Sequence, residues 1–81
     1  NRLTEITTFT FQNFFKFINQ MALSYNKINK IESYSFSSLN QALFLDLSHN
    51  CLRYFENQTF IGLYYLNNLN LSYNFIEFIQ E

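Results

Sequence analysis

A short motif returns at a fixed interval along this chain of 81 residues. The motif is Leu-Ser-Tyr-Asn or Leu-Ser-His-Asn, and it stands at residues 23–26, 47–50 and 71–74, 24 residues apart each time. Periods of about 20 to 50 residues are typical of repeat proteins, in which each unit buries its apolar face only against its neighbours. The interval therefore predicts a stack of similar units rather than a fold closed around one central core.

Apolar residues keep fixed distances from the asparagine that ends each motif. They stand eight, five and three positions before it, and two and five positions after it. Two further apolar slots lie ten and thirteen positions after the first two asparagines. The slots hold Ile18, Met21, Leu23, Ile28, Ile31, Phe36 and Leu39, then Ala42, Leu45, Leu47, Leu52, Phe55, Phe60 and Leu63, then Leu66, Leu69, Leu71, Ile76 and Ile79. Ala42 is the one small side chain among them.

The leading segment follows the same offsets with one irregularity. Asn1 precedes Asn26 by 25 positions, which indicates an extra residue between Phe17 and Met21. The predicted units are a partial or irregular leading repeat at 1–17, repeats at 18–41 and 42–65, and a truncated repeat at 66–81. Terminal units normally carry polar caps. No cap is visible, so we expect one uncapped solenoid segment of a longer protein.

Each unit combines two periodicities. The Leu-x-Leu segments at 21–23, 45–47 and 69–71 alternate as β-strands do, while apolar residues recur about every third position from Phe36 to Leu45. An amphipathic helix would explain the second pattern alone but not the first. Parallel strands need long crossovers, which the rest of each unit supplies. We therefore predict an α/β-type repeat, with a short parallel sheet on the concave face and irregular or short helical return segments on the convex face.

Two kinds of residue should connect neighbouring units. Asn26, Asn50 and Asn74 follow the strands, where their amides can bond to backbone groups that the bend leaves unpaired. We expect them to form a structural ladder. Phe36 and Phe60 should stack as a spine on the return side.

Composition excludes several classes of function. The net charge is −1, and the five basic residues are scattered, which argues against nucleic acid as a partner. One cysteine, Cys51, and one histidine, His49, cannot form a metal cluster or an internal disulfide, and no cofactor motif is present. No apolar run has the length of a membrane span.

The series Ile18-x-x-Met21-x-Leu23-x-x-Asn26-x-Ile28-x-x-Ile31-x-x-x-x-Phe36-x-x-Leu39 resembles the typical 24-residue class of leucine-rich repeat. Residues 42–63 repeat the series and residues 66–79 begin it again. The phrase Leu-Asp-Leu-Ser-His-Asn-Cys-Leu at 45–52 is similar to those of Toll-like receptor ectodomains. Slit-like proteins, small leucine-rich proteoglycans and lamprey lymphocyte receptors share this class.

The resemblance implies that a curved solenoid recognises a protein or microbial ligand in the extracellular space or the endosomal lumen. A Toll-like receptor would also dimerise and signal, and its membrane attachment would come from parts outside these residues. The alternatives are a secreted or matrix interaction protein and an intracellular leucine-rich-repeat scaffold. None of these is an enzyme.

Outward-facing residues of the strands are the first candidates for binding. Tyr25, His49 and Tyr73 should align in one column, either as a recognition patch or, more commonly in repeats, by packing on one another and covering backbone. Phe44 should face solvent, where it meets a partner or packs on a flanking residue. Asp46 completes the candidates. Together with Ser48 and His49 it invites a catalytic interpretation, but both Asp46 and Ser48 belong to one strand without a pocket, and Ser48 is part of the repeat.

Two N-glycosylation sequons are present, Asn57-Gln58-Thr59 and Asn70-Leu71-Ser72. The motif is short and arises readily by chance in a chain rich in asparagine. A glycan on Asn70, at an outward strand position, would cover part of the concave face and move ligand binding elsewhere on the segment.

Overall fold

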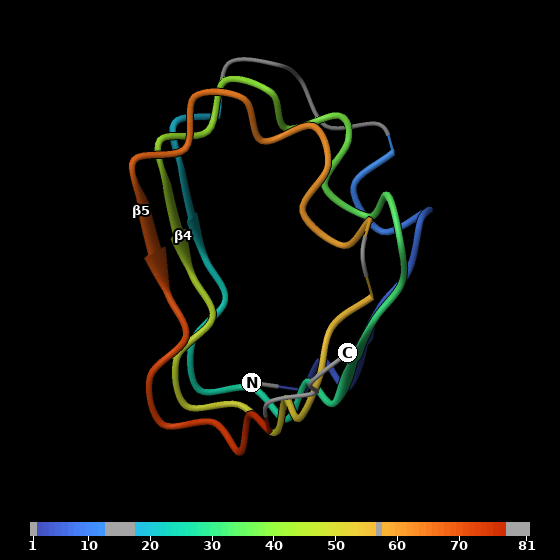
Figure 1. Ribbon diagram of the computed structural model, residues 1–81, viewed down its shortest axis with the longest axis vertical. Coiled ribbons are helices and arrows are strands. Elements are labelled where there is room, and N and C mark those ends of the chain that lie inside the picture. The colour runs from blue at the N-terminus through green and yellow to red at the C-terminus, as the bar shows by residue number, and fades with distance from the viewer. Residues whose placement is uncertain (1, 13–17, 57, 78–81) are drawn as a thin grey trace.

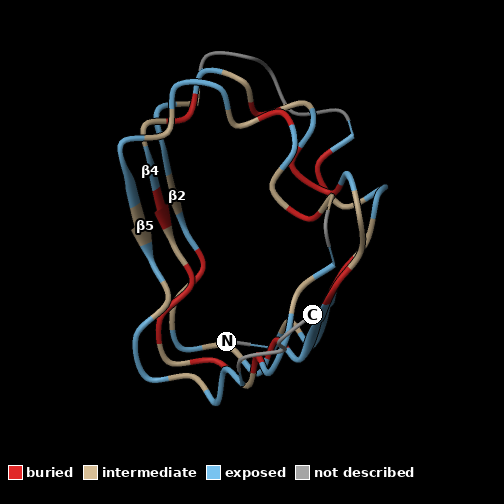
Figure 2. Ribbon diagram, viewed as in Figure 1, coloured by how far each residue is buried: buried red, intermediate tan, exposed pale blue. Residues whose placement is uncertain are grey.

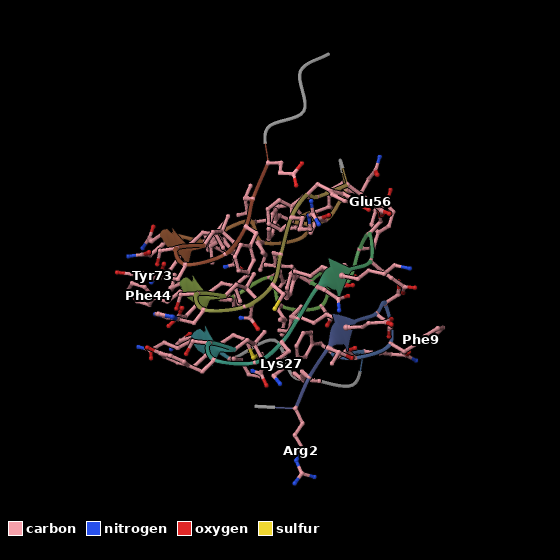
Figure 3. The ribbon with its side chains drawn as sticks, turned by 90° about the horizontal axis from the view of Figure 1, so that it is seen from below. Arg2, Phe9, Lys27, Phe44, Glu56 and Tyr73 are labelled. Atoms are coloured by element: carbon pink, nitrogen blue, oxygen red, sulfur yellow. The ribbon has the colours of Figure 1, made fainter. Side chains whose placement is uncertain are left out.

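The computed structural model describes residues 2–12, 18–56 and 58–77. The chain winds through successive coils that lie one upon another (Figure 1). One wall carries strands β2 (Gln20–Ala22), β4 (Phe44–Asp46) and β5 (Asn68–Asn70), and the opposite wall carries β1 (Glu5–Ile6) and β3 (Lys30–Ile31) (Figures 1 and 3). We call these the strand wall and the return wall.

The strand wall is a parallel sheet in the order β2-β4-β5. Met21 pairs with Leu45, and Leu45 pairs with Leu69. The 24-residue interval of the sequence is therefore the register of the sheet. Each strand lies one residue earlier than the Leu-x-Leu segments predict, although hydrogen bonds continue past its end, as from Leu23 N to the Asp46 carbonyl at 2.8 Å.

The return wall was predicted to be irregular or to contain short helical segments, and the helical alternative is wrong for the described residues. No helix occurs in the described residues, and so none is long and apolar enough to cross a membrane there. β1 and β3 instead form a second parallel pair, in which Glu5 lies opposite Lys30. Past β3 the chain makes separate turns, with Leu39 N bonded to the Phe36 carbonyl at 3.0 Å and Ala42 N to the Leu39 carbonyl at 3.1 Å. The three-residue apolar spacing belongs to these turns rather than to a helix.

The buried apolar residues form one core cluster, and Figure 2 shows that buried positions occur on both walls of the coils. Every buried apolar residue of the core occupies a slot of the repeat: Ile6, Phe11, Leu23, Ile28, Ile31, Phe36, Leu39, Ala42, Leu45, Leu47 and Leu52. The corresponding residues of β5 and its surroundings, such as Leu69 and Leu71, are only half-buried. Among the described residues they have a neighbouring coil on one side alone, as expected where each unit is buried by its neighbours.

Asparagine side chains tie each coil to the one before it. The Oδ1 of Asn50 accepts from Ile28 N at 3.0 Å, and its Nδ2 donates to the carbonyls of Leu23 and Leu47, both at 3.0 Å. Asn74 repeats this arrangement one coil later, with Leu52 N at 2.9 Å and the Leu47 carbonyl at 2.9 Å. These amides take up backbone groups that the bend leaves without strand partners.

Three further contacts join neighbouring coils. Phe36 is fully buried, and its ring lies 5.8 Å from that of Phe11 and 6.0 Å from that of Phe60. Asn26, the first asparagine of the motif, accepts from Leu3 N at 3.2 Å. Gly62 has a φ of 104°, and a Cβ there would lie 2.5 Å from the Cα of Ser37 in the preceding coil.

Replacement of Asn50 by alanine should lower the free energy of unfolding by about 3 kcal/mol, because it leaves buried backbone groups unsatisfied at ~1–3 kcal/mol each. Chemical unfolding would measure the loss. Asn68→Ala is the matched control, since Asn68 is exposed and its side chain has no hydrogen bond within the described residues; its effect should stay below about 0.5 kcal/mol. Equal effects of the two substitutions would contradict the ladder.

Gly62→Ala should destabilise the protein by about 2 kcal/mol or more, because the added methyl group meets backbone atoms and φ is unfavourable for a side chain. A lower midpoint of thermal unfolding would show it. The neighbouring Ile61→Ala removes an exposed side chain and should lower the midpoint much less. If Gly62→Ala had the smaller effect, the close approach of the two coils would be wrong.

Candidate functional site

The outer side of the strand wall, which we call the strand face, is built from four rows of residues. The strand register places one residue of each strand in the first two rows, and the 24-residue period continues the alignment into two further rows beyond the strand ends. The rows are Gln20, Phe44 and Asn68; Ala22, Asp46 and Asn70; Ser24, Ser48 and Ser72; and Tyr25, His49 and Tyr73. Figure 3 shows Phe44 and Tyr73 on this side of the molecule, with Phe9 on the opposite side.

Three rings form a continuous stack beyond the ends of the strands. The His49 ring lies 4.1 Å from that of Tyr25 and 4.3 Å from that of Tyr73, and the ring planes are within 10° and 8° of parallel. We call this the aromatic stack. Packing among the rings is therefore present, yet Tyr25 and Tyr73 remain 61% and 74% exposed. The stack is both a structural column and an accessible aromatic surface.

The backbone holds the aromatic stack in an uncommon conformation. The φ angles are 59° at Tyr25, 56° at His49 and 59° at Tyr73. Side chains other than glycine seldom occupy this region. Hydrogen bonds from Tyr25 N to the Ser48 carbonyl at 3.2 Å and from His49 N to the Ser72 carbonyl at 3.0 Å stabilise it. The rings thus project from a fixed turn.

The neighbouring rows contain a repeated acceptor–serine pair. The Oδ1 of Asp46 accepts from the hydroxyl of Ser48 at 2.6 Å and from its N–H at 3.0 Å. Asn70 and Ser72 form the same pair, at 2.6 Å and 3.0 Å. Hydrogen bonds from the Ser48 hydroxyl and then from its N–H lower the pKa of Asp46 below its usual 3.8, against the opposing effect of burial.

This arrangement does not form a serine–histidine pair among the described residues. The Ser48 hydroxyl is buried and donates to Asp46, whereas His49 is held between two tyrosine rings. A serine nucleophile requires a base within hydrogen-bond reach. Among the described residues, the base bonded to the Ser48 hydroxyl is Asp46 and not His49, so the Ser–His–Asp order of a catalytic triad is not formed.

A shallow hollow of about 360 Å³ lies over the strands, apart from the aromatic stack. It is lined by Gln20, Met21, Ala22, Phe44, Leu45, Asp46, Asn68 and Asn70. Phe44 is 42% exposed, and no other ring stacks on it among the described residues. The hollow was not foreseen from the sequence, because its lining combines side chains of three strands that are far apart along the chain.

Other candidates have a less distinctive environment. Asn57 lies outside the described residues, and Cys51 is a half-buried free thiol.

A second hollow of about 410 Å³ on the return wall is lined by Asn29, Lys30, Ile31, Tyr54 and Glu56. The exposed ion pair of Arg53 and Glu77, at 2.5 Å, links two coils but contributes little stability, as is usual on a surface.

Asp46→Asn should change the response of stability to pH. Because the folded-state pKa of Asp46 is lowered, its carboxylate stabilises the fold above the unfolded pKa, and this contribution is lost as pH falls through the folded value. In protein made in bacteria, without glycosylation, the stability difference between wild type and Asp46→Asn should shrink from neutral to acidic pH. Glu5→Gln, an exposed substitution on the return wall, is the control. A difference independent of pH would contradict the role given to Ser48.

Comparison with known proteins shows a family and a protein to which this chain is similar. Residues 1–52 match the family described as "Leucine rich repeat". The chain is also similar to Toll-like receptor 3 of Boselaphus tragocamelus, with 39% identity over 66 residues, which are 79% of this chain and 7% of that receptor. It thus spans a small fraction of the length of this relative. The sequence match and the repeat pattern agree, and the chain belongs to the leucine-rich repeat family.

Proposed function

We propose that this chain is a non-catalytic recognition segment of an extracellular leucine-rich-repeat receptor of the Toll-like kind, coiled as part of a longer solenoid. The aromatic stack is the surface that touches the protein or microbial ligand. The observation that carries the proposal is the continuous stack of Tyr25, His49 and Tyr73 on turns fixed by the backbone. Rigid, exposed tyrosines bring large contact areas at low cost in conformational entropy.

The chemistry of the strand face also supports a neutral or polar partner. Asp46 is the one carboxylate in the four rows, and no lysine or arginine stands in them. Phosphate-rich ligands are usually bound by clusters of basic residues. Charge therefore argues against nucleic acid contact on this segment, in agreement with the scattered basic residues of the sequence.

The location of the protein tests the receptor assignment. In the native cells, the full-length protein should be an integral membrane protein whose repeats resist protease until the membrane of the vesicles is opened. Recovery from the medium would support a secreted or matrix interaction protein instead. A soluble cytosolic protein, digested without opening vesicles, would support an intracellular scaffold.

Photo-crosslinking tests the contact surface even while the identity of the ligand is open. Tyr73→p-benzoylphenylalanine in the full-length receptor should give a covalent adduct on live cells exposed to the natural stimulus. The same replacement at Phe9, which is 74% exposed on the opposite side, is the control. Adducts at position 9 and none at position 73 would show that the partner uses the return wall.

The affinity for the partner measures how much each tyrosine contributes to binding. Once the adduct identifies the partner, Tyr25→Ala or Tyr73→Ala should weaken its binding about tenfold or more, since truncation of an aromatic hot spot costs ~1–2 kcal/mol or more. Phe9→Ala should leave the affinity within about twofold, a change of ~0.4 kcal/mol. Equal losses for all three would mean that the aromatic stack has no special part in binding.

A further inference from the structure

We propose that Asn70 carries an N-linked glycan and that its first sugar packs against Phe44 in the hollow of the strand face. The proposal rests on passage through the secretory pathway, which the proposed function includes. It assigns an occupant to the hollow and gives the exposed ring of Phe44 a partner within the same molecule.

The first argument is the state of the Asn70 amide. Asn70 begins the sequon Asn70-Leu71-Ser72 and is exposed. Its Oδ1 is held by the hydroxyl and the N–H of Ser72, whereas its Nδ2 has no hydrogen-bond partner within the described residues. The nitrogen that would bear the sugar is therefore free, and a bond to it breaks no contact of the fold.

Asn74, four residues later, shows the opposite arrangement. Its Nδ2 donates to the carbonyls of Leu47, Leu71 and Ser72 at 2.9, 3.0 and 3.3 Å. A sugar on that nitrogen would remove bonds that join two coils. The fold thus separates asparagines that hold the coils together from one whose amide is free for modification.

The second argument is the place of Asn70 on the strand face. Asn70 and Phe44 line the same hollow, together with the amides of Gln20 and Asn68. Its volume of about 360 Å³ lies in the range of ~300–1,000 Å³ found for small-molecule sites. A pyranose ring has an apolar face of C–H bonds that packs on an aromatic ring, and hydroxyls that bond to amides. Phe44, Gln20 and Asn68 supply both kinds of contact.

The covalent step needs a lipid-linked oligosaccharide diphosphate as co-substrate. The bond between the first sugar carbon and the phosphate oxygen breaks, and a bond from that carbon to Nδ2 of Asn70 forms. The amide loses one proton, and the lipid diphosphate leaves with the bonding electrons and takes up a proton. No change of oxidation state occurs.

A glycan in the hollow divides the strand face into two parts. The region over β2, β4 and β5 is shielded, whereas the aromatic stack is not among the residues that line the hollow. Partner contacts on the strand face are then confined to the aromatic stack.

Mass spectrometry of the full-length protein from native cells tests the modification. Amidase release of the glycan in ¹⁸O-water should convert Asn70 to labelled aspartate. When the receptor is expressed in the same cells, Asn70→Gln and Ser72→Ala should abolish the label at this site, whereas Ser72→Thr should retain it. Unmodified Asn70 in receptor that carries glycans elsewhere would overturn the proposal.

A second expression experiment distinguishes a wrong assignment of the glycosylation site from a wrong assignment of the extracellular location. The same chain is directed into the secretory pathway by an added signal peptide. Asn70 that is unmodified in both preparations overturns the sequon assignment. Asn70 modified only with the added signal overturns the extracellular location, and with it the native glycan, while the chemistry of the site stands.

Thermal unfolding tests the contact with Phe44. Release of the glycan should lower the unfolding midpoint of wild type and of the Phe9→Ala control by more than it lowers that of Phe44→Ala. An equal decrease in all three proteins would show that the sugar does not pack on Phe44. Each protein is compared with and without its glycan, so destabilisation by Phe44→Ala itself does not affect the result.

Discussion

The hydrogen bonds that the asparagine side chains make between coils are the interaction on which this structure depends. A strand of three residues forms too few backbone bonds to hold a coil by itself, and the bend after the strand leaves backbone groups without partners. Asn50 meets both needs, since one amide accepts from Ile28 in the preceding coil and donates to carbonyls of two coils. An unpaired buried backbone group is costly. The number of residues between successive asparagines therefore corresponds to the number of residues in each coil.

The same turn that carries the ladder also presents the candidate contact surface. Each residue of the aromatic stack immediately precedes a ladder asparagine, as Tyr73 precedes Asn74. A positive φ at the first residue turns its ring outward, while the next side chain points inward to the carbonyls. Stacking of the rings offsets part of the conformational cost. Core and surface are thus two sides of one turn, and the aromatic stack has the rigidity of the ladder.

The sequence alone could predict those features of the fold that follow from the 24-residue period. The 24-residue interval predicts the pairing of Met21 with Leu45, the buried apolar slots and the alignment of the aromatic stack. A helix was wrongly among the expectations for the return wall, since turns repeated every three residues and a helix place apolar residues alike. The hollow could not be predicted, because its depth depends on side-chain sizes across three strands. Likewise, the bond from Ser48 to Asp46 depends on rotamers, which the order of residues does not show.

Variation within the rows indicates where selection for function can act. Ladder asparagines and buried leucines recur in each unit because every coil meets the same packing problem. The row of Ala22, Asp46 and Asn70 has no such constraint, and its members differ in size, charge and capacity for modification. Asp46 and Asn70 make the same two hydrogen bonds to a serine, so the turn accommodates either side chain with the same geometry. The choice between them changes the chemistry of the surface: a carboxylate in the middle strand provides a charge and a pH-dependent contribution to stability, whereas an amide in the neighbouring strand provides a nitrogen to which a sugar can be joined.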